Sequence, residues 1–213
     1  MIKDRADLIN YYIEDHGFIN YLEIGVFDGE NIRKIKAAHK DGVDPGSEGK
    51  MVPEVNFKMT SDEFFLLIKG FDIYYDIIFI DGLHHSEQVD RDIANSLEHL
   101  VTDGIIVLHD CNPPTEGHAA VPRQQSEWNG DVYKSIIKFR YEGKYPCWVY
   151  DMDWGLGVIY KREARVKNIS YISEEQYERG ISDWEYFDKN RGDLLGLINN
   201  NNILDDYTSN RNK

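Results

Sequence analysis

The sequence predicts an α/β fold, a Rossmann-like doubly wound sheet that is mostly parallel and ends in an antiparallel strand pair. Three observations support this class. Short apolar runs alternate with segments of helical periodicity, several of these runs stop abruptly at a carboxylate, and two late apolar runs are joined only by the turn 151–155. In open sheets of this kind, ligands bind in the crevice beyond the carboxyl ends of the strands.

The first half of the chain supplies most of the expected parallel strands. Residues 4–16 carry apolar side chains at helical spacing and are followed by Gly17, a plausible helix end. The expected elements that follow are a strand at 18–24, a glycine turn at 25–29, a helix at 30–39, a strand ending at 42–45, loop chemistry at 45–53, a strand at 55–59 and a helix at 61–69.

The second half continues the alternation and then changes character. We expect a strand at 76–81, a helix at 87–100, a strand at 104–110, a helix at 131–141, and strands at 147–150 and 156–160. The intervening segment 111–130 has no periodicity, and such a loop inside a compact domain is usually functional. It could form a lid that excludes water.

Composition bounds the architecture and the partners. The chain has 213 residues, which suits one full-sized domain at residues 1–165 plus a polar C-terminal extension at 166–213 that is not a separate domain. We expect this extension to pack loosely or to serve contacts in a homo-oligomer, and residues 205–213 to fray. A formal net charge of −14 argues against nucleic acid or an anionic membrane as a partner and leaves a small molecule or glycan.

Cysteine usage and hydropathy suggest a cytoplasmic location. Cys111 and Cys147 are too few for a disulfide framework, and no pair has the spacing of a zinc site. No stretch approaches the roughly 20 apolar residues of a membrane span, and the N-terminus lacks the apolar core of a signal peptide.

The first strand and turn favour a nucleoside that carries a positive charge. Glycines in the turn let the backbone approach a ligand, yet Phe27 and Glu30 stand where the dinucleotide fingerprint needs glycine. Glu23, at the strand end, would repel a pyrophosphate and attract a cation. Asp44, about 20 residues on, can accept hydrogen bonds from both ribose hydroxyls. S-adenosylmethionine has these properties. The alternative is that Glu23 and Asp44 only shape turns.

At this point the chain resembles a known family. The matching segments, in family order between residues 18 and 161, are Glu-Ile-Gly-Val-Phe-Asp-Gly, Gly-Val-Asp-Pro, Met-Thr-Ser-Asp-Glu-Phe-Phe, Ile-Phe-Ile-Asp-Gly-Leu-His-His and Ile-Val-Leu-His-Asp-Cys-Asn. They are similar to class I S-adenosylmethionine-dependent methyltransferases. Within that class they most resemble the small family of macrocin and mycinamicin O-methyltransferases and cephalosporin-hydroxylase-like proteins.

The resemblance implies a set of cofactor-binding residues. It places the methionine end of the cofactor at the first strand and turn, the ribose at the second strand, and the adenine beside the helix that follows: Glu23, Gly25, Phe27, Asp44, Ser61 and Asp62, with Asp81 also facing the cofactor. One departure is the short connection between the second and third strands, which leaves little room for the usual intervening helix.

The chemical centre is expected at the ends of two later strands. Asp81 and Asp110 should face one crevice, where two carboxylates can hold Mg²⁺ and a nearby histidine can take a proton. The resemblance implies that Asp81, His109 and Asp110 bind the metal and that His84 is the catalytic base, with Asp81 also catalytic. His109 departs from the family, which carries an acid there. Whether a metal is needed stays open.

Plainer roles exist for several of these residues. His85 could cap the following helix, His109 could be a histidine satisfied under a loop, Asp131 could cap a helix, and Asp151 and Asp153 could simply be solvated in a turn. Cys111 is expected to pack rather than to react.

Two other functions also remain open. A metal-dependent oxygenase or hydrolase could use iron or magnesium at Asp81, His84 or His85, and Asp110. A non-catalytic module could bind the nucleoside alone.

Overall fold

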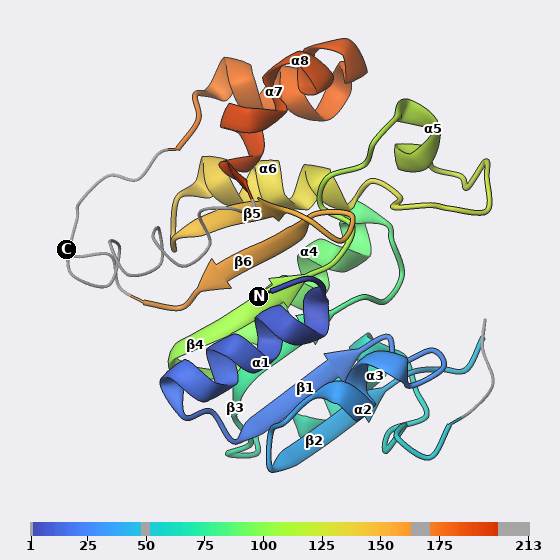
Figure 1. Cartoon of the computed structure of the whole chain (residues 1–213), viewed down its shortest axis with the longest axis vertical. Coiled ribbons are helices and arrows are strands. Elements are labelled where there is room, and N and C mark those ends of the chain that lie inside the picture. Colours follow the sequence, from blue (N-terminus) through green and yellow to red (C-terminus); the bar gives the residue numbers. More distant parts are fainter. Residues whose placement is uncertain (1, 48–51, 163–170, 200–213) are drawn as a thin grey trace.

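Seven strands form one mixed sheet in the order β2-β1-β3-β4-β6-β5-β7 (Figure 1). This computed structural model describes residues 2–47, 52–162 and 171–199. The strands are β1 Asn20–Ile24, β2 His39–Val43, β3 Tyr75–Ile80, β4 Leu100–Leu108, β5 Cys147–Asp151, β6 Leu156–Tyr160 and β7 Leu197–Asn199. Strands β1 to β4 are parallel, β6 runs antiparallel to β4 and β5, and β7 is parallel to β5. The predicted fold class is therefore confirmed.

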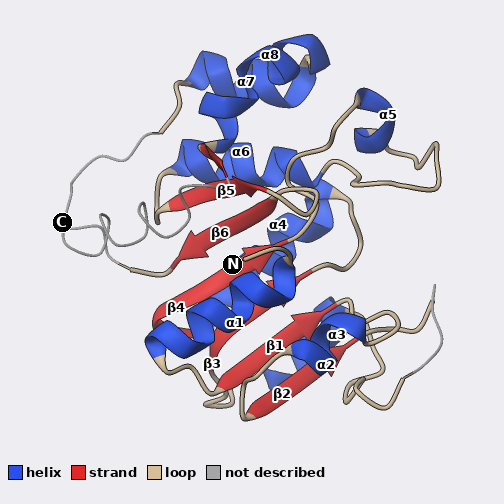
Figure 2. Cartoon of the chain, viewed as in Figure 1, coloured by secondary structure: helices blue, strands red, loops and turns tan. Residues whose placement is uncertain are grey.

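Helices cover both faces of this sheet (Figure 2). They are α1 Arg5–His16, α2 Glu30–Lys34, α3 Ser61–Ile68, α4 Ser86–Glu98, α5 Glu116–Ala119, α6 Val132–Glu142, α7 Glu174–Ser182 and α8 Trp184–Leu195. Helices α1 and α2 pack on one face, and α3, α4, α6 and α8 pack on the other. Within the described residues, no helix is both long and apolar enough to cross a bilayer.

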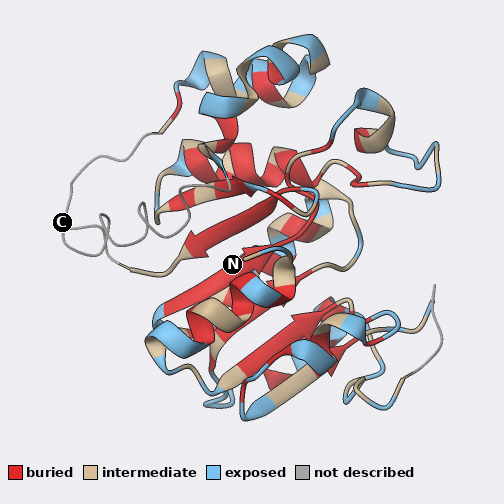
Figure 3. Cartoon of the chain, in the orientation of Figure 1, coloured by how far each residue is buried: buried red, intermediate tan, exposed pale blue. Residues whose placement is uncertain are grey.

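Strand β3 shows why the sheet is buried on both sides. Successive side chains of a strand point to opposite faces, so Ile78 and Ile80 join the core under α3 and α4, while Ile77 and Phe79 join the core under α1. The continuous apolar run is typical of a parallel strand covered on both faces. Figure 3 shows the buried strands between their helices.

The strand register brings the predicted site residues to one edge. Ile24 of β1 pairs with Val43 of β2 and with Ile80 of β3, and Ile80 pairs with Leu108 of β4. Because these strands are parallel and aligned, the residues that follow them emerge together: Asp44, Gly25, Asp81 and His109.

Two predicted elements differ from the structure. The strand expected at 55–59 is not formed. Phe57 makes one isolated bridge to Val43, and the Asn56 side chain, rather than a backbone carbonyl, accepts the Gly42 N–H. The helix expected at 30–39 ends at Lys34, because Ile35 turns to an extended backbone conformation and is buried.

The C-terminal extension is well packed where the structure describes it. Helix α8 buries Phe187, Leu194 and Leu195 in the core beside α6. Arg140 of α6 donates to the carbonyl oxygens of Cys147 and Leu194, which ties the end of α8 to β5. The prediction of a loosely packed extension is therefore wrong for residues 171–199. The frayed end predicted at 205–213 lies outside the described residues.

Candidate active site

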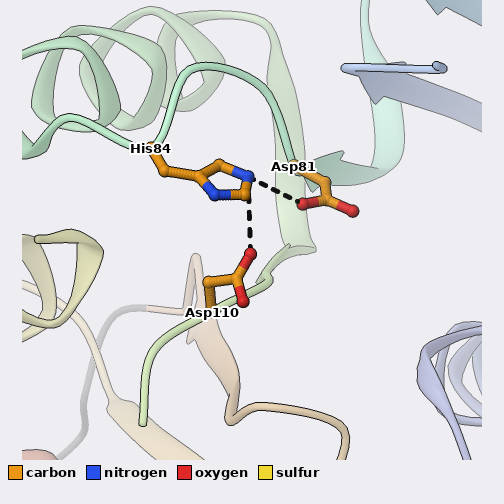
Figure 4. A group of neighbouring side chains, drawn as sticks. All are labelled: Asp81, His84 and Asp110. Carbon is orange, nitrogen blue, oxygen red and sulfur yellow. Dashed lines mark ion pairs between the residues drawn. The ribbon is translucent and has the colours of Figure 1, made fainter. Parts of the chain in front are cut away.

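Three predicted residues converge at the ends of β3 and β4. Nε2 of His84 lies 3.3 Å from Oδ1 of Asp81 and 3.4 Å from Oδ2 of Asp110 (Figure 4). One ligand atom from each residue lies within 4.8 Å of the other two. Asp81 follows β3 directly, and Asp110 follows β4 after His109 in a left-handed backbone conformation with φ +63°. The imidazole thus bridges two carboxylates at the end of the sheet.

The loop before α6 fixes the orientation of His84. Nδ1 of His84 lies 3.1 Å from the carbonyl oxygen of Trp128, and the two rings stack with centroids 5.4 Å apart. Because a carbonyl only accepts, it selects the form in which Nδ1 carries a proton. Nε2 is then the atom that faces the carboxylates. Gly130 is required here, since a Cβ on it would lie 1.8 Å from the His84 carbonyl oxygen.

His109 lies beneath this group and is surrounded by acids. Its Nδ1 is 2.9 Å from Oδ2 of Asp110 and 3.4 Å from Oδ1 of Asp81, and its Nε2 is 3.4 Å from Oδ1 of Asp153. It is 5% exposed. Burial disfavours its charged form, but the neighbouring charge of Asp81 and hydrogen bonds to Asp110 and Asp153 outweigh burial and raise the pKa of His109 well above its usual value. His109 is therefore a buried cation between three carboxylates.

Two further residues of the site were not predicted from the sequence. The Arg5 guanidinium at the start of α1 donates to Asp81 (2.8 Å) and to both carboxylate oxygens of Asp153 (3.0 and 3.2 Å). The backbone N–H of Arg5 also donates to Asp153. Asp153, expected to be solvated in the β5–β6 turn, is instead held between Arg5 and His109. That earlier interpretation of Asp153 is wrong.

The charges of the site nearly balance. Burial alone would raise the pKa of Asp81, yet His109, His84 and Arg5 together hold it well below its usual range. The pKa of Asp153 is lowered in the same way, with His109 and Arg5 outweighing burial. The pKa of His84 is raised, because its hydrogen bond to Asp81 and the charges of Asp110 and Asp81 outweigh the cost of burial.

The β1–α2 turn lies directly beside this centre. A Cβ on Gly25 would come within 2.0 Å of the Asp81 carbonyl oxygen, so only glycine allows β1 and β3 to approach so closely. Glu23 is buried below the turn, where its carboxylate accepts hydrogen bonds from the Tyr21 hydroxyl and from Asn31. Burial raises the pKa of Glu23 to about 7. A buried carboxylate of this kind would be stabilised by a cationic ligand.

The remaining predicted cofactor residues form two groups along the same edge. Oδ2 of Asp44 accepts the Phe27 N–H at 2.9 Å, which fixes the turn, and Phe27 is itself exposed with φ +50°. Ser61 and Asp62 open α3, and the amide of Gln88 lies 3.2 Å from an oxygen of each. The structure therefore places Asp44 and Phe27 by the end of β2, and Ser61 and Asp62 at the start of α3 beside α4.

The donor set fits a divalent cation only in part. Two carboxylates and one imidazole are suitable ligands, but Arg5 and His109 already pair with the same carboxylates. His109, predicted as a ligand, is not in the converging group, and neither is His85, whose ring packs edge-on against Trp128. His84 and His109 contact the same carboxylate oxygens of Asp81 and Asp110, but the described residues hold no set of two histidines and one carboxylate whose ligand atoms all lie within 4.8 Å of one another.

Several plainer predictions can also be judged from the contacts. Asp131 precedes α6 but makes no capping hydrogen bond to it; its carboxylate accepts from the backbone and hydroxyl of Ser86 at the start of α4. His85 stands at the N-cap position of α4 without a side-chain capping bond. Cys111 is fully buried, and burial raises the pKa of its thiol well above the usual value, as expected for a packing residue.

Comparison with known proteins identifies the class of this fold. A sequence profile of the methyltransferase domain family matches residues 22–111. A Staphylococcus aureus protein assigned as a caffeoyl-CoA O-methyltransferase has 16% identity and a TM-score of 0.55, with 76% of this chain and 85% of that chain covered. A Klebsiella pneumoniae protein assigned as an O-methyltransferase has 15% identity and a TM-score of 0.54, with 73% and 79% covered.

A third solved structure contains the methyl donor. The O-methyltransferase TomG of Streptomyces achromogenes, in complex with S-adenosylmethionine, has 12% identity and a TM-score of 0.50, with 73% of this chain and 78% of that chain covered. No curated protein matches the sequence. The profile match spans β1 to the end of β4, the part of the chain that carries Glu23, Asp44, Asp81 and Asp110. Residues 22–111 therefore match the methyltransferase domain family, and this chain has the fold of these O-methyltransferase structures.

Proposed function

We propose that this methyltransferase transfers the methyl group of S-adenosylmethionine to a hydroxyl of a sugar, a glycan precursor or a similar small molecule. One observation carries the proposal: an imidazole with a fixed orientation and two carboxylates converge beside the glycine turn of a methyltransferase domain. Oxygen becomes a competent nucleophile for methyl transfer when its proton is removed, and this group is suited to receive that proton.

The donor half of the reaction would lie at the ends of β2, β1 and β3. The exposed turn around Phe27 and the carboxylate of Asp44 line the route to the adenosine, and the buried Glu23 lies under the methionine end. Positive charge on the sulfonium and ammonium groups would favour the ionised form of Glu23. Such a site would hold donor and acceptor in line for the transfer.

The acceptor half would depend on His84. With Nδ1 held by the Trp128 carbonyl, Nε2 is directed into the site and can take the hydroxyl proton as the methyl group moves. His84 must be neutral to accept the proton. Because the pKa of His84 is raised above its ordinary value of 6.5, the rate should still increase with pH above pH 6.5. Asp81 and Asp110 would stabilise the imidazolium that forms.

A divalent cation, with Mg²⁺ as one candidate, would be held by Asp81, Asp110 and His84. When bound, such an ion orients a hydroxyl and lowers its pKa. Ligation would use Nε2 of His84, the same atom that would accept the proton, so a metal-bound His84 could not also be the base. The partial charge balance supplied by Arg5 and His109 supports a site that also functions without the ion.

Charge and chemistry support a neutral acceptor and a cytoplasmic location. A net charge of −14 disfavours polyanionic acceptors, nucleic acid and anionic membranes. Both cysteines are free and buried, as expected for a reducing compartment.

The test combines ligand binding with turnover. A thermal-shift and calorimetric screen with S-adenosylmethionine, S-adenosylhomocysteine, NAD and divalent metals should give a shift with the two adenosyl ligands and none with NAD. A panel of sugars, glycosides and phenols is then assayed for S-adenosylhomocysteine release. Binding without turnover on every acceptor would favour a module that only binds the nucleoside, and the absence of adenosyl-ligand binding would overturn the proposal.

A further inference from the structure

An open hollow of about 450 Å³ lies next to the His84 group, over the ends of β6 and β5. It is lined by the β5–β6 turn, by Asn112 and Pro114 after β4, and by two residues of the C-terminal extension, Arg191 and Leu197. Asp153 lines the hollow and also contacts Arg5 and His109. The hollow is therefore the next space along the sheet edge, on the side opposite the glycine turn.

An aromatic ring is held out into solvent at this hollow. Trp154 is 38% exposed and has φ +65°, a conformation that is costly for a bulky side chain. Asp153 before it has φ +45°. Residues in such conformations persist only where the surroundings enforce them, and they gather at ligand sites. Here the Asn112 N–H donates to the Trp154 carbonyl oxygen, and the indole ring lies against His118.

A row of polar side chains forms the facing wall. Nδ2 of Asn112 donates to Oδ1 of Asp151 at 3.0 Å, and Nη1 of Arg191 donates to Oδ1 of Asn112 at 2.6 Å. The second oxygen of Asp151 and the Nε–H of Arg191 have no hydrogen-bond partner among the described residues. The row thus offers an acceptor and a donor on the two sides of Asn112, in the same hollow as an aromatic ring.

These features select a chemical class. An indole packs well against the apolar face of a ring. The Asp151 carboxylate can accept a hydrogen bond from one hydroxyl of such a ring, and the Arg191 guanidinium can donate to another. The carboxylates of Asp151 and Asp153 would repel an anionic ligand. Arg191 would attract one only weakly, because its charge is already paired with Asp188. A neutral ring that bears more than one hydroxyl satisfies all of these groups.

We propose that this hollow is the acceptor site, that it binds a neutral ring with more than one hydroxyl, and that Trp154 and Arg191 determine its specificity. The inference rests on the proposed function and extends it, because it assigns the C-terminal helix α8 to acceptor recognition. Arg191 would act from outside the segment that carries the methyltransferase match, residues 22–111.

The test measures binding of three probes by saturation-transfer NMR to the protein loaded with S-adenosylhomocysteine. The probes are methyl α-D-glucopyranoside, catechol and glucose 6-phosphate. We expect at least one of the two neutral diols to bind, and glucose 6-phosphate to bind more weakly than the glucopyranoside. Trp154→Asn and Arg191→Gln should each weaken binding of the neutral probe at least fivefold. Asparagine is chosen at position 154 because it tolerates the left-handed backbone conformation.

Matched variants separate the hollow from general effects. Arg179→Gln removes an arginine from α7 of the same extension that does not line the hollow, and Trp148→Phe changes a tryptophan on β5. Both should bind the probes as the wild-type protein does. All four variants should bind S-adenosylhomocysteine within twofold of the wild-type affinity.

Failure of this inference can be told apart from failure of the proposed function. If S-adenosylhomocysteine does not bind, the proposed function fails. If it binds but neither neutral diol does, or if they bind equally to Trp154→Asn and Arg191→Gln, the acceptor site is not this hollow. Tighter binding of glucose 6-phosphate than of the glucopyranoside would overturn the neutral class.

Discussion

Arg5 and Asp153 form a three-point contact between residues 148 positions apart in the sequence. The guanidinium meets both oxygens of the Asp153 carboxylate, and the Arg5 backbone N–H meets one of them again. The same guanidinium reaches Asp81 at the end of β3. The first turn of α1 is thereby attached to the two sides of the candidate active site, and the acids of that site gain a permanent counter-charge.

Removal of this counter-charge should destabilise the protein. Arg5 and Asp153 are largely shielded, so Arg5→Gln leaves Asp81 and Asp153 less well compensated. We expect the free energy of unfolding in urea at pH 7.5 to fall by about 1–2 kcal/mol, less than for a fully buried pair. The control is Arg33→Gln, which breaks the more exposed pair with Glu54 and should lower the free energy of unfolding much less. Equal losses of unfolding free energy in the two variants would show that the Arg5–Asp153 contact stabilises the protein no more than an exposed ion pair does.

His84 should be needed for turnover and not for cofactor binding. With an acceptor identified in the panel, His84→Gln should lower kcat by roughly 10²–10⁴, the range for loss of a general base. The Kd for S-adenosylhomocysteine should change less than threefold. His85→Gln, next in sequence but outside the converging group, is the control and should retain most activity. Equal activity of His84→Gln and the wild-type protein would exclude His84 as the base.

Asp44 should contribute to binding of the methyl donor. Its two oxygens accept the backbone N–H groups of Phe27 and Gly46, and we expect the carboxylate to accept from the ribose hydroxyls as well. Asp44→Ala should weaken the binding of S-adenosylhomocysteine, measured by calorimetry, at least tenfold, which is a loss of about 1.4 kcal/mol in binding free energy. Asp72→Ala, at an exposed position before β3, serves as the control and should leave the affinity unchanged. An affinity for Asp44→Ala within threefold of wild type would remove Asp44 from the donor site.

Glu23 should make stability fall as the pH rises toward neutrality. Burial raises its pKa from 4.5 to about 7, so the folded state binds a proton that the unfolded state releases. The stabilising contribution is complete below pH 4.5 and is lost as the pH rises through 7. Between those limits the wild-type free energy of unfolding should fall by about 3 kcal/mol more than that of Glu23→Gln.

The free energies of unfolding of the wild-type protein and Glu23→Gln are compared by urea titration at several pH values across this range. Glu142→Gln, a change at an exposed position of α6, should keep the wild-type slope. Parallel curves for Glu23→Gln and the wild-type protein would mean that Glu23 is ionised throughout.

Gly130 should tolerate no side chain. Any residue at φ +62° pays a backbone cost, and at Gly130 a Cβ would also meet the His84 carbonyl oxygen. Gly17, at φ +69° with open space around it, isolates the backbone cost of about 1 kcal/mol. In urea unfolding, Gly130→Ala should lower the free energy of unfolding by at least about 2 kcal/mol more than Gly17→Ala does, since the loop or His84 must move. Equal costs would show that the loop adjusts freely.

The edge that carries the site could be predicted because it is encoded locally. Apolar runs that stop at Asp81 and Asp110 mark strand ends, and the parallel arrangement brings such ends together without knowledge of any tertiary contact. The glycine turn after β1 is local in the same sense. What the sequence indicates poorly is the orientation of side chains at that edge. His109 contacts Asp81 and Asp110, as its position in the sequence suggests, but its second ring nitrogen faces Asp153, a contact that the sequence does not indicate.

The remaining parts of the site depend on contacts between distant segments. Nothing near Arg5 indicates that its side chain reaches Asp153, and nothing near Trp128 indicates that its carbonyl orients His84. The strand expected at 55–59 does not form, because the Gly42 N–H donates to the side chain of Asn56 rather than to a backbone carbonyl. The pattern of apolar residues does not reveal such a side-chain contact. The extension after residue 170 looked polar because most of α7 and α8 faces solvent, and only a few residues such as Phe187 enter the core.

Strand β7 also determines how the far border of the sheet is presented to other molecules. An outermost strand offers unpaired amide and carbonyl groups that can template aggregation, and proteins commonly keep such borders short. Among the described residues the border is a strand of three residues paired with the five of β5. A shortened chain that ends before Leu197 would uncover β5, so aggregation of truncated forms would be a consequence of lost edge protection rather than of a disrupted core.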